Sequence, residues 1–204
     1  MTYPNVAPSS VPGDLASGVA AAVERYRRDG DVGLIFDALR ALAAGKPAAD
    51  LIAAASPYLE MPEVVIPMYE IVVDASPSNA QAMVVLANAY WLTGRGPDVV
   101  GALASRAIAA DAKNRGAWHL WALADASVRG RVERWTTVVE HFPNDHLARA
   151  ALADNATSLA SDEQDPLALD LAITTYEWLL SQTKQTAQRL ALESTLETLR
   201  KWKL

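Results

Sequence analysis

Residues 75–96 read ASPSNAQAMVVLANAYWLTGRG and have the boundary signals of a single helix. Ser78 followed three residues later by Gln81 matches a capping box, and Gly94 is the residue type that most often ends a helix in the left-handed conformation. Between these signals, apolar residues recur at spacings of three and four and form two stripes, which indicates a helix with neighbours on two sides. The stripes consist of Ala82, Met83, Leu86, Ala87, Ala89 and Tyr90.

The small residues of this helix recur along the chain at a period of about 30 to 40 residues. Four repeats can be aligned so that they begin at Lys46, Ala80, Arg115 and His146. Their third residues are Ala48, Ala82, Ala117 and Ala148. Their eighth residues are Ala53, Ala87, Ala122 and Ala153, and the bulky residues before them are Ile52, Leu86, Trp121 and Leu152. Each repeat ends in apolar residues and a Pro or Asn turn, so it predicts a helical hairpin whose alanines allow close packing.

These repeats resemble the tetratricopeptide repeat family, which places a large residue before a small one in the first helix and alanine, aromatic and proline positions in the second. The first clear repeat matches at Ile52, Ala53, Val65, Tyr69, Val72 and Pro77. The second matches at Leu86, Ala87, Tyr90, Gly94, Val100, Ala107 and Asp111, and the third at Trp118, Trp121, Ala122, Trp135, Val138 and Pro143. The resemblance covers about residues 46–180 and implies an all-α fold, a right-handed α-solenoid of stacked antiparallel hairpins.

The expected boundaries follow from the repeats. The hairpins are expected over residues 14–45, 46–79, 80–114, 115–145 and 146–182, and a C-terminal capping helix over 184–203. A polar outer face on the last helix is what a terminal cap requires. Residues 1–13 contain three prolines and little to bury, which predicts a disordered tail before a single domain over 14–204.

Three local features depart from the repeat pattern. The turn near Gly130 is shortened and Arg131 occupies an alanine position, which predicts a short second helix in the third repeat. The polar segment SLASDEQ, 158–164, predicts a mobile loop before Asp165 caps the next helix. Pro67 falls inside an expected helix and predicts either a kink or the helix start.

Composition excludes several functional classes. The net charge of −6 leaves little positive charge for phosphates or anionic membranes, so we expect neither nucleic-acid nor membrane binding. The absence of cysteine excludes disulfides and thiolate chemistry. Apolar runs are far shorter than the roughly 20 residues that span a bilayer, and the first residues lack a signal-peptide pattern, so we expect a cytoplasmic protein.

By resemblance, the first helices of the hairpins line a concave groove that binds a peptide or protein segment. The groove residues implied are Asp50, Tyr58, Gln81, Val84, Asn88, Trp91, Leu92, His119, Leu123 and Asp154. Tyr58 and Trp91 are the aromatic anchors of this hypothesis. Each also has a structural alternative, such as packing of Trp91 under the Gly94 turn. Asn88 matches one position of the family's carboxylate clamp, but Val84 stands where the clamp needs a lysine.

No catalytic, cofactor or metal motif stands out. His141 and His146 flank a turn without a third ligand, so a metal site is the weaker interpretation. We therefore predict a non-catalytic adaptor or assembly factor with a protein or peptide partner and no cofactor. The alternatives are a structural subunit or homo-oligomer, and a maturation chaperone, since AITTYEWLL at 172–180 is similar to the C-terminal repeats of cytochrome c biogenesis proteins.

Overall fold

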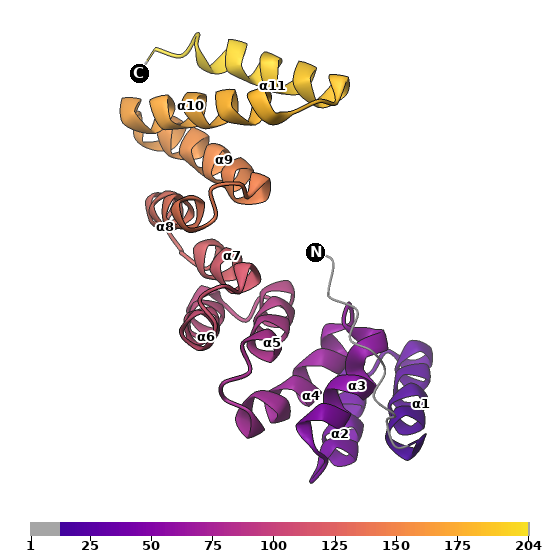
Figure 1. Cartoon of the computed structure of the whole chain (residues 1–204). Helices are drawn as coiled ribbons and strands as arrows, with labels where there is room; N and C mark the ends of the chain where they lie inside the picture. Colours follow the sequence, from indigo (N-terminus) through magenta and orange to yellow (C-terminus); the bar gives the residue numbers. More distant parts are fainter. Residues whose placement is uncertain (1–12, 204) are drawn as a thin grey trace. The chain divides into compact units, whose positions relative to one another are not determined.

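The computed structural model describes residues 13–203, and these form α-helices and one short 3-10 helix without any strand (Figure 1). The predicted all-α class is therefore confirmed. Residues 1–12 of the expected tail lie outside the described residues, and Gly13 already begins the first helix. The elements are α1 (Gly13–Asp29), α2 (Val32–Ala43), α3 (Ala48–Ala55), η1 (Ser56–Tyr58), α4 (Pro62–Ala75), α5 (Ala80–Leu92), α6 (Pro97–Ala110), α7 (Arg115–Leu123), α8 (Val128–His141), α9 (His146–Glu163), α10 (Pro166–Gln182) and α11 (Thr186–Leu199).

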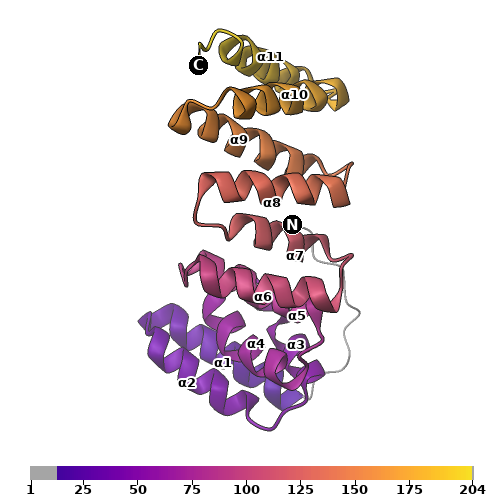
Figure 2. The same cartoon turned by 90° about the vertical axis from the view of Figure 1, so that its left-hand side faces the viewer.

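The helices gather into two compact units, an N-terminal unit (Met1–Ala117) and a C-terminal unit (Trp118–Leu204), and the division falls within α7. In the N-terminal unit, α1 packs on α2 and α3, both α2 and α3 pack on α4, and α5 packs between α4 and α6. In the C-terminal unit, α8 packs on α9, α9 on α10 and α10 on α11 (Figure 2). Most helices thus pack on the next one in the chain within each unit, as in a helical-repeat protein, while a single domain over 14–204 stays a prediction.

Helix boundaries are set by short polar side chains and prolines. Asp31, Asn79, Ser127, Asp145 and Asp165 each accept a hydrogen bond from a backbone N–H in the first turn of the helix that they precede. Such caps satisfy donors that have no partner inside the helix. The predicted capping box of Ser78 and Gln81 is wrong, because α5 begins one residue later than that pattern requires and Asn79 is its cap.

The repeated alanines lie at the helix contacts. Six of the eight predicted alanines are at most 2% exposed: Ala82, Ala87, Ala117, Ala122, Ala148 and Ala153. In the first repeat the pattern is wrong by one position, since Ala48 and Ala53 are half-buried while Leu51, Ala54 and Ala55 are buried. The helix there is short, eight residues, and continues into a 3-10 turn, which changes the face that it presents.

Two predicted irregularities are regular helix. The segment 158–164 continues α9 to Glu163, and burial of Leu159 and Ala160 outweighs the polar composition that suggested a loop. Gln164 then ends α9 in the left-handed conformation at φ 53°. The second helix of the third repeat is 14 residues long, as long as α4 and α6, so the prediction that it would be short is also wrong.

Pro67 lies buried inside α4 and does not mark its start, because Pro62 opens the helix. A proline has no N–H, so the carbonyl of Glu63 cannot receive the usual helical hydrogen bond from residue 67. Of the described helices, none combines the length and apolarity needed to cross a membrane.

We expect Ala87→Leu to destabilise the protein by about 1 to 3 kcal/mol, because added volume in a filled core forces neighbours apart. Ala87 is fully buried in α5 between two packed helices. Urea unfolding followed by circular dichroism measures the change. Ala109→Leu, on the exposed side of α6, is the matched control and should leave the unfolding midpoint nearly unchanged. Equal midpoints for both variants would contradict the role of small residues in the helix contacts.

Candidate binding surfaces

Helix α5 carries five of the ten predicted groove residues. Gln81, Val84, Asn88 and Trp91 recur at spacings of three and four, so they share one side of the helix, and Leu92 follows beside them. Most other residues of α5 are buried. On this side, Trp91 is 41% exposed, Leu92 is 62% exposed, and Asn88 is half-buried.

The N-terminal half of that side is covered. A Cβ on Gly116, in the first turn of α7, would lie 3.2 Å from Cγ1 of Val84, and the Asn114 amide donates a hydrogen bond of 3.3 Å to the Gln81 side chain. Val84 is therefore only 4% exposed, and its prediction as a groove residue is wrong because the start of α7 occupies its surface. What remains open is the α5 patch, which we define as Asn88, Trp91 and Leu92.

Three further predicted residues lie on other elements. Asp50 is in the first turn of α3, Tyr58 ends the 3-10 turn, and Leu123 ends α7. All three are half-buried. Their part in binding stays a prediction.

His119 is buried, and its prediction as a groove residue is wrong. Its Nε2 lies 2.6 Å from Oδ2 of Asp145, and its ring meets the edge of Trp135 at a centroid distance of 5.3 Å. The other oxygen of Asp145 accepts hydrogen bonds from two backbone N–H groups in the first turn of α9. One carboxylate thus joins α7 to the start of α9, which gives His119 a structural role.

Asp154, the last predicted groove residue, is exposed on α9 and accepts a 2.6 Å hydrogen bond from the Tyr176 hydroxyl of α10. Burial, followed by this bond, raises the pKa of Tyr176 to about 12. A carboxylate held by a neutral phenol remains an acceptor for further donors. Asp154 can therefore take part in binding, although its position is fixed by the α9–α10 contact.

The two histidines beside the FPND turn lie against aromatic rings. The ring of His141 lies 4.2 Å from that of Trp118, and the ring of His146 lies 5.1 Å from that of Trp178. Among residues 13–203 there is no group of three or more side chains arranged to hold a metal ion. These histidines pack as surface aromatics.

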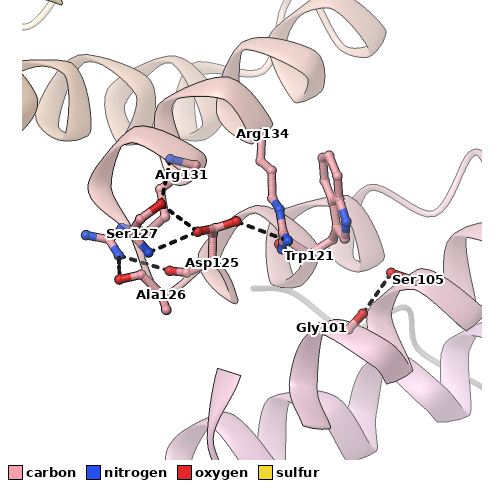
Figure 3. A network of polar contacts seen from close by, with 9 residues as sticks. Gly101, Ser105, Trp121, Asp125, Ala126, Ser127, Arg131 and Arg134 are labelled. Atoms are coloured by element: carbon pink, nitrogen blue, oxygen red, sulfur yellow. Dashed lines mark hydrogen bonds and ion pairs between the residues drawn. The ribbon is translucent and has the colours of Figure 1, made fainter. Parts of the chain in front are cut away.

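A polar network holds the turn between α7 and α8 (Figure 3). The Asp125 carboxylate accepts hydrogen bonds from the N–H and hydroxyl of Ser127 and forms an ion pair of 3.1 Å with Arg134. Arg134 also donates to the Trp121 carbonyl at 2.7 Å and stacks its guanidinium 4.9 Å from that ring. The backbone hydrogen bond from Ser127 is the largest cause that lowers the pKa of Asp125. The Asp125 carboxylate is therefore engaged in holding this turn.

Arg131 explains why the third repeat departs from the alanine pattern. Its guanidinium donates to the carbonyls of Asp125 and Ala126 at 3.0 and 3.3 Å (Figure 3). It also donates to the Asn155 side chain of α9 at 2.8 Å. An arginine can satisfy several carbonyls at once because its donors are fixed in a planar fork. Arg131 therefore binds the turn that follows α7, which an alanine at this position could not do.

Sequence reasoning missed one region, the wall formed by Glu70 of α4 and Tyr90 of α5. The Tyr90 hydroxyl donates 2.8 Å to Glu70, whose carboxylate also lies 3.0 Å from Arg40 and 3.8 Å from Arg95. Burial and then the bond to Glu70 raise the pKa of Tyr90 to about 12. The second apolar stripe of α5 signalled that this side faces a neighbour, but the sequence does not show that a pocket lies there.

Comparison with known proteins supports the class of fold that these packed hairpins define, an all-α helical repeat of the tetratricopeptide type. No protein-family model matches the chain, and no curated protein sequence matches it. The chain is similar to the crystal structure of the MamA protein, with a TM-score of 0.56 and 15% identity over 85% of this chain and 98% of that one. A candidate protein-binding protein from Bacteroides ovatus ATCC 8483 gives a TM-score of 0.33 and 13% identity over 94% and 98%, and no conclusion rests on it. The likeness to MamA concerns the fold alone.

We expect Gly130→Ala to destabilise the C-terminal unit, because its new Cβ would lie 2.3 Å from an Asp125 carboxylate oxygen. The carboxylate must then leave Ser127 or Arg134, at a cost of about 1 to 3 kcal/mol. Chemical denaturation measures the loss. In the Asp125→Ala background the same glycine change should cost much less, and an equal cost in both backgrounds would show that the contact is unimportant.

The raised pKa of Tyr90 predicts an alkaline limit to stability. Its folded value of about 12 exceeds the ordinary value of 10.0, so its contribution is fully present below pH 10 and is lost as the pH rises towards 12. We expect Tyr90→Phe to reduce the pH dependence of unfolding free energy in this interval, measured by urea titration at successive pH values. Tyr58→Phe, outside this wall, is the control, and an unchanged slope in Tyr90→Phe would contradict the assignment.

Proposed function

We propose that the chain is a non-catalytic protein-binding module, an adaptor or assembly factor, that holds a peptide or protein segment against the α5 patch. The observation that carries this proposal is the exposure of Trp91 and Leu92 at the end of a helix that is otherwise almost entirely buried. Tryptophan is prominent among the residues that dominate binding energy at protein interfaces. A large aromatic and a leucine in contact with water are available for such burial.

The position of the patch supports a role in binding, rather than exposure of apolar side chains without a function. Helix α5 is fixed by α4 on one side and α6 on the other, so the backbone under Trp91 is already ordered. A partner then loses less free energy to ordering the site, which raises affinity. Asn88, half-buried one turn before Leu92, offers both a donor and an acceptor to the backbone of an extended segment.

The engagement of the polar clusters supports the non-catalytic part of the proposal. The carboxylates of Glu70, Asp125 and Asp145 each bind cations, hydroxyls or N–H groups of neighbouring helices. Acid or base catalysis needs a group that can exchange protons with a substrate. The acidic net charge favours protein over nucleic-acid partners. The cytoplasmic location expected from the sequence stays a prediction.

A second candidate function is self-association through the C-terminal unit. Leu147, Leu167 and Leu190, on α9, α10 and α11, are 64%, 79% and 62% exposed. Leucines in contact with water are stabilised when a second copy covers them. Absolute mass measured over a range of protein concentrations distinguishes this function from binding to a different protein.

We expect the double variant Asn88→Ala/Trp91→Ala to lose its partner, because truncation of central interface residues costs about 2 kcal/mol or more, roughly thirtyfold in affinity. The measurement is affinity capture from the native host, followed by titration of the captured partner in purified form. Circular dichroism should show unchanged helicity, since both side chains point away from the core.

The matched control is Leu147→Ala/Leu167→Ala, which removes exposed apolar groups from the other unit. Its partners should be those of the unaltered protein. A partner that binds the Asn88/Trp91 variant with full affinity would place the binding surface elsewhere. A concentration-dependent homo-oligomer lost only in the Leu147/Leu167 variant would favour self-association.

A further inference from the structure

An apolar hollow, separate from the α5 patch, lies in the N-terminal unit between α4, α5 and α6. Its volume is about 590 Å³, within the size range of ligand-binding pockets. We call it the α4–α6 pocket. Its apolar lining consists of Val73, Leu86, Tyr90, Val99, Ala102 and Leu103. Val99 at its margin is 45% exposed, so the pocket opens to solvent and can receive a side chain.

The wall of the pocket is preformed. Tyr90 is held by its hydrogen bond to Glu70 and by the guanidinium of Arg95, 4.8 Å above its ring. Glu70 is held in turn by Arg40 of α2. These contacts join α2, α4 and α5, so that the apolar surface needs little rearrangement to accept a partner group.

The pocket and the α5 patch are separate surfaces. At about 100° of rotation per residue, Leu86 and Tyr90 point to the side of α5 roughly opposite Asn88 and Trp91. The pocket is lined instead by the second helices of two successive hairpins, α4 and α6. A partner in the pocket therefore does not need the surface used in the proposed function.

The charges around the pocket are mostly negative. Its lining includes the carboxylates of Glu70, Asp74 and Asp98, and Arg106 is its one basic residue. Glu70 is already paired with arginines, whereas Asp74 and Asp98 form no ion pair with any described residue. Asp74 also lies in the last turn of α4, where the helix macrodipole disfavours an anion. A cation brought by a partner would relieve this unfavourable position.

We propose that the α4–α6 pocket is a second docking site, for a protein segment that places an aliphatic side chain next to a lysine or arginine. The aliphatic group fills the hollow over Leu86 and Ala102. The cation reaches the carboxylates of Asp74 and Asp98 at the margin. Apolar burial supplies most of the affinity, while the exposed charge pairs select basic over acidic segments.

The test uses blocked dipeptides and backbone amide NMR of the full chain, since one side chain in a pocket binds weakly. The probes are acetyl-Leu-Lys-amide, acetyl-Leu-Glu-amide and acetyl-Ser-Lys-amide. We expect the Leu-Lys probe to shift amides around the pocket in α4 and α6. It should bind about fivefold more tightly than the Leu-Glu probe, as exposed charge pairs allow. The Ser-Lys probe should bind more weakly still, because it lacks the apolar group.

Two variants test the two parts of the site. Asp74→Asn/Asp98→Asn should remove the preference for Leu-Lys over Leu-Glu and leave a common weak affinity. Ala102→Trp should fill the hollow and abolish binding of both probes, while Ala187→Trp, exposed on α11 of the C-terminal unit, should bind like the unaltered protein. If Ala102→Trp lowers helicity, the Asp74/Asp98 variant still decides the charge requirement.

Failure of this inference is distinguishable from failure of the proposed function. Shifts that gather at Trp91, or binding lost in Asn88→Ala/Trp91→Ala but kept in Ala102→Trp, would overturn the pocket and support the α5 patch. Equal affinity for Leu-Lys and Leu-Glu in the unaltered protein, or no shifts around the pocket, would also overturn it. Binding that survives the Asn88/Trp91 change and disappears with Ala102→Trp would establish it.

Discussion

The rest of the structure depends on the close packing of helices at the buried alanines of the repeats. Ala87, Ala122 and Ala153 stand at the same place in successive repeats and are fully buried. A side chain without γ atoms lets two backbones approach, and the neighbouring bulky residues then fill the remaining space. Because α5 is packed on two sides in this way, little of its surface remains to meet water, and what remains is concentrated in the α5 patch.

Carboxylates provide a second level of specificity between helices. Glu70 joins α4 to α5, Asp145 joins α7 to α9, and Asp154 joins α9 to α10. Apolar packing alone is not directional, whereas a hydrogen bond to a carboxylate has a defined geometry. Removal of one partner leaves the other buried polar group unsatisfied, which destabilises the fold. These three carboxylates therefore serve structural contacts, whereas Asp74 and Asp98 form no ion pair with any described residue and belong to the second docking site that we propose.

Helix α5 shows how one helix serves two surfaces. Its Asn88–Trp91 side is covered at the N-terminal half by the start of α7 and open at the other end. Its Leu86–Tyr90 side forms the floor of a hollow between α4 and α6. Both surfaces combine an apolar centre with polar groups at the edge, the usual composition of a protein-binding site. If both proposals hold, their separation lets two segments bind to α5 at the same time.

By itself, the sequence determined the helices and the hairpins, because caps, prolines and alanine spacing act locally and recur. It placed the cap of α10 and the buried alanines of three repeats correctly, and it predicted that α5 has two apolar sides. Only the tertiary structure decided which residues stay exposed. Val84 is buried under the start of α7, and His119 is buried against Asp145. Residues 158–163 are helical because Leu159 is buried, although their polar composition suggested a loop. The exposure of a side chain depends on contacts with residues distant in the chain, and a local repeat pattern does not specify those contacts.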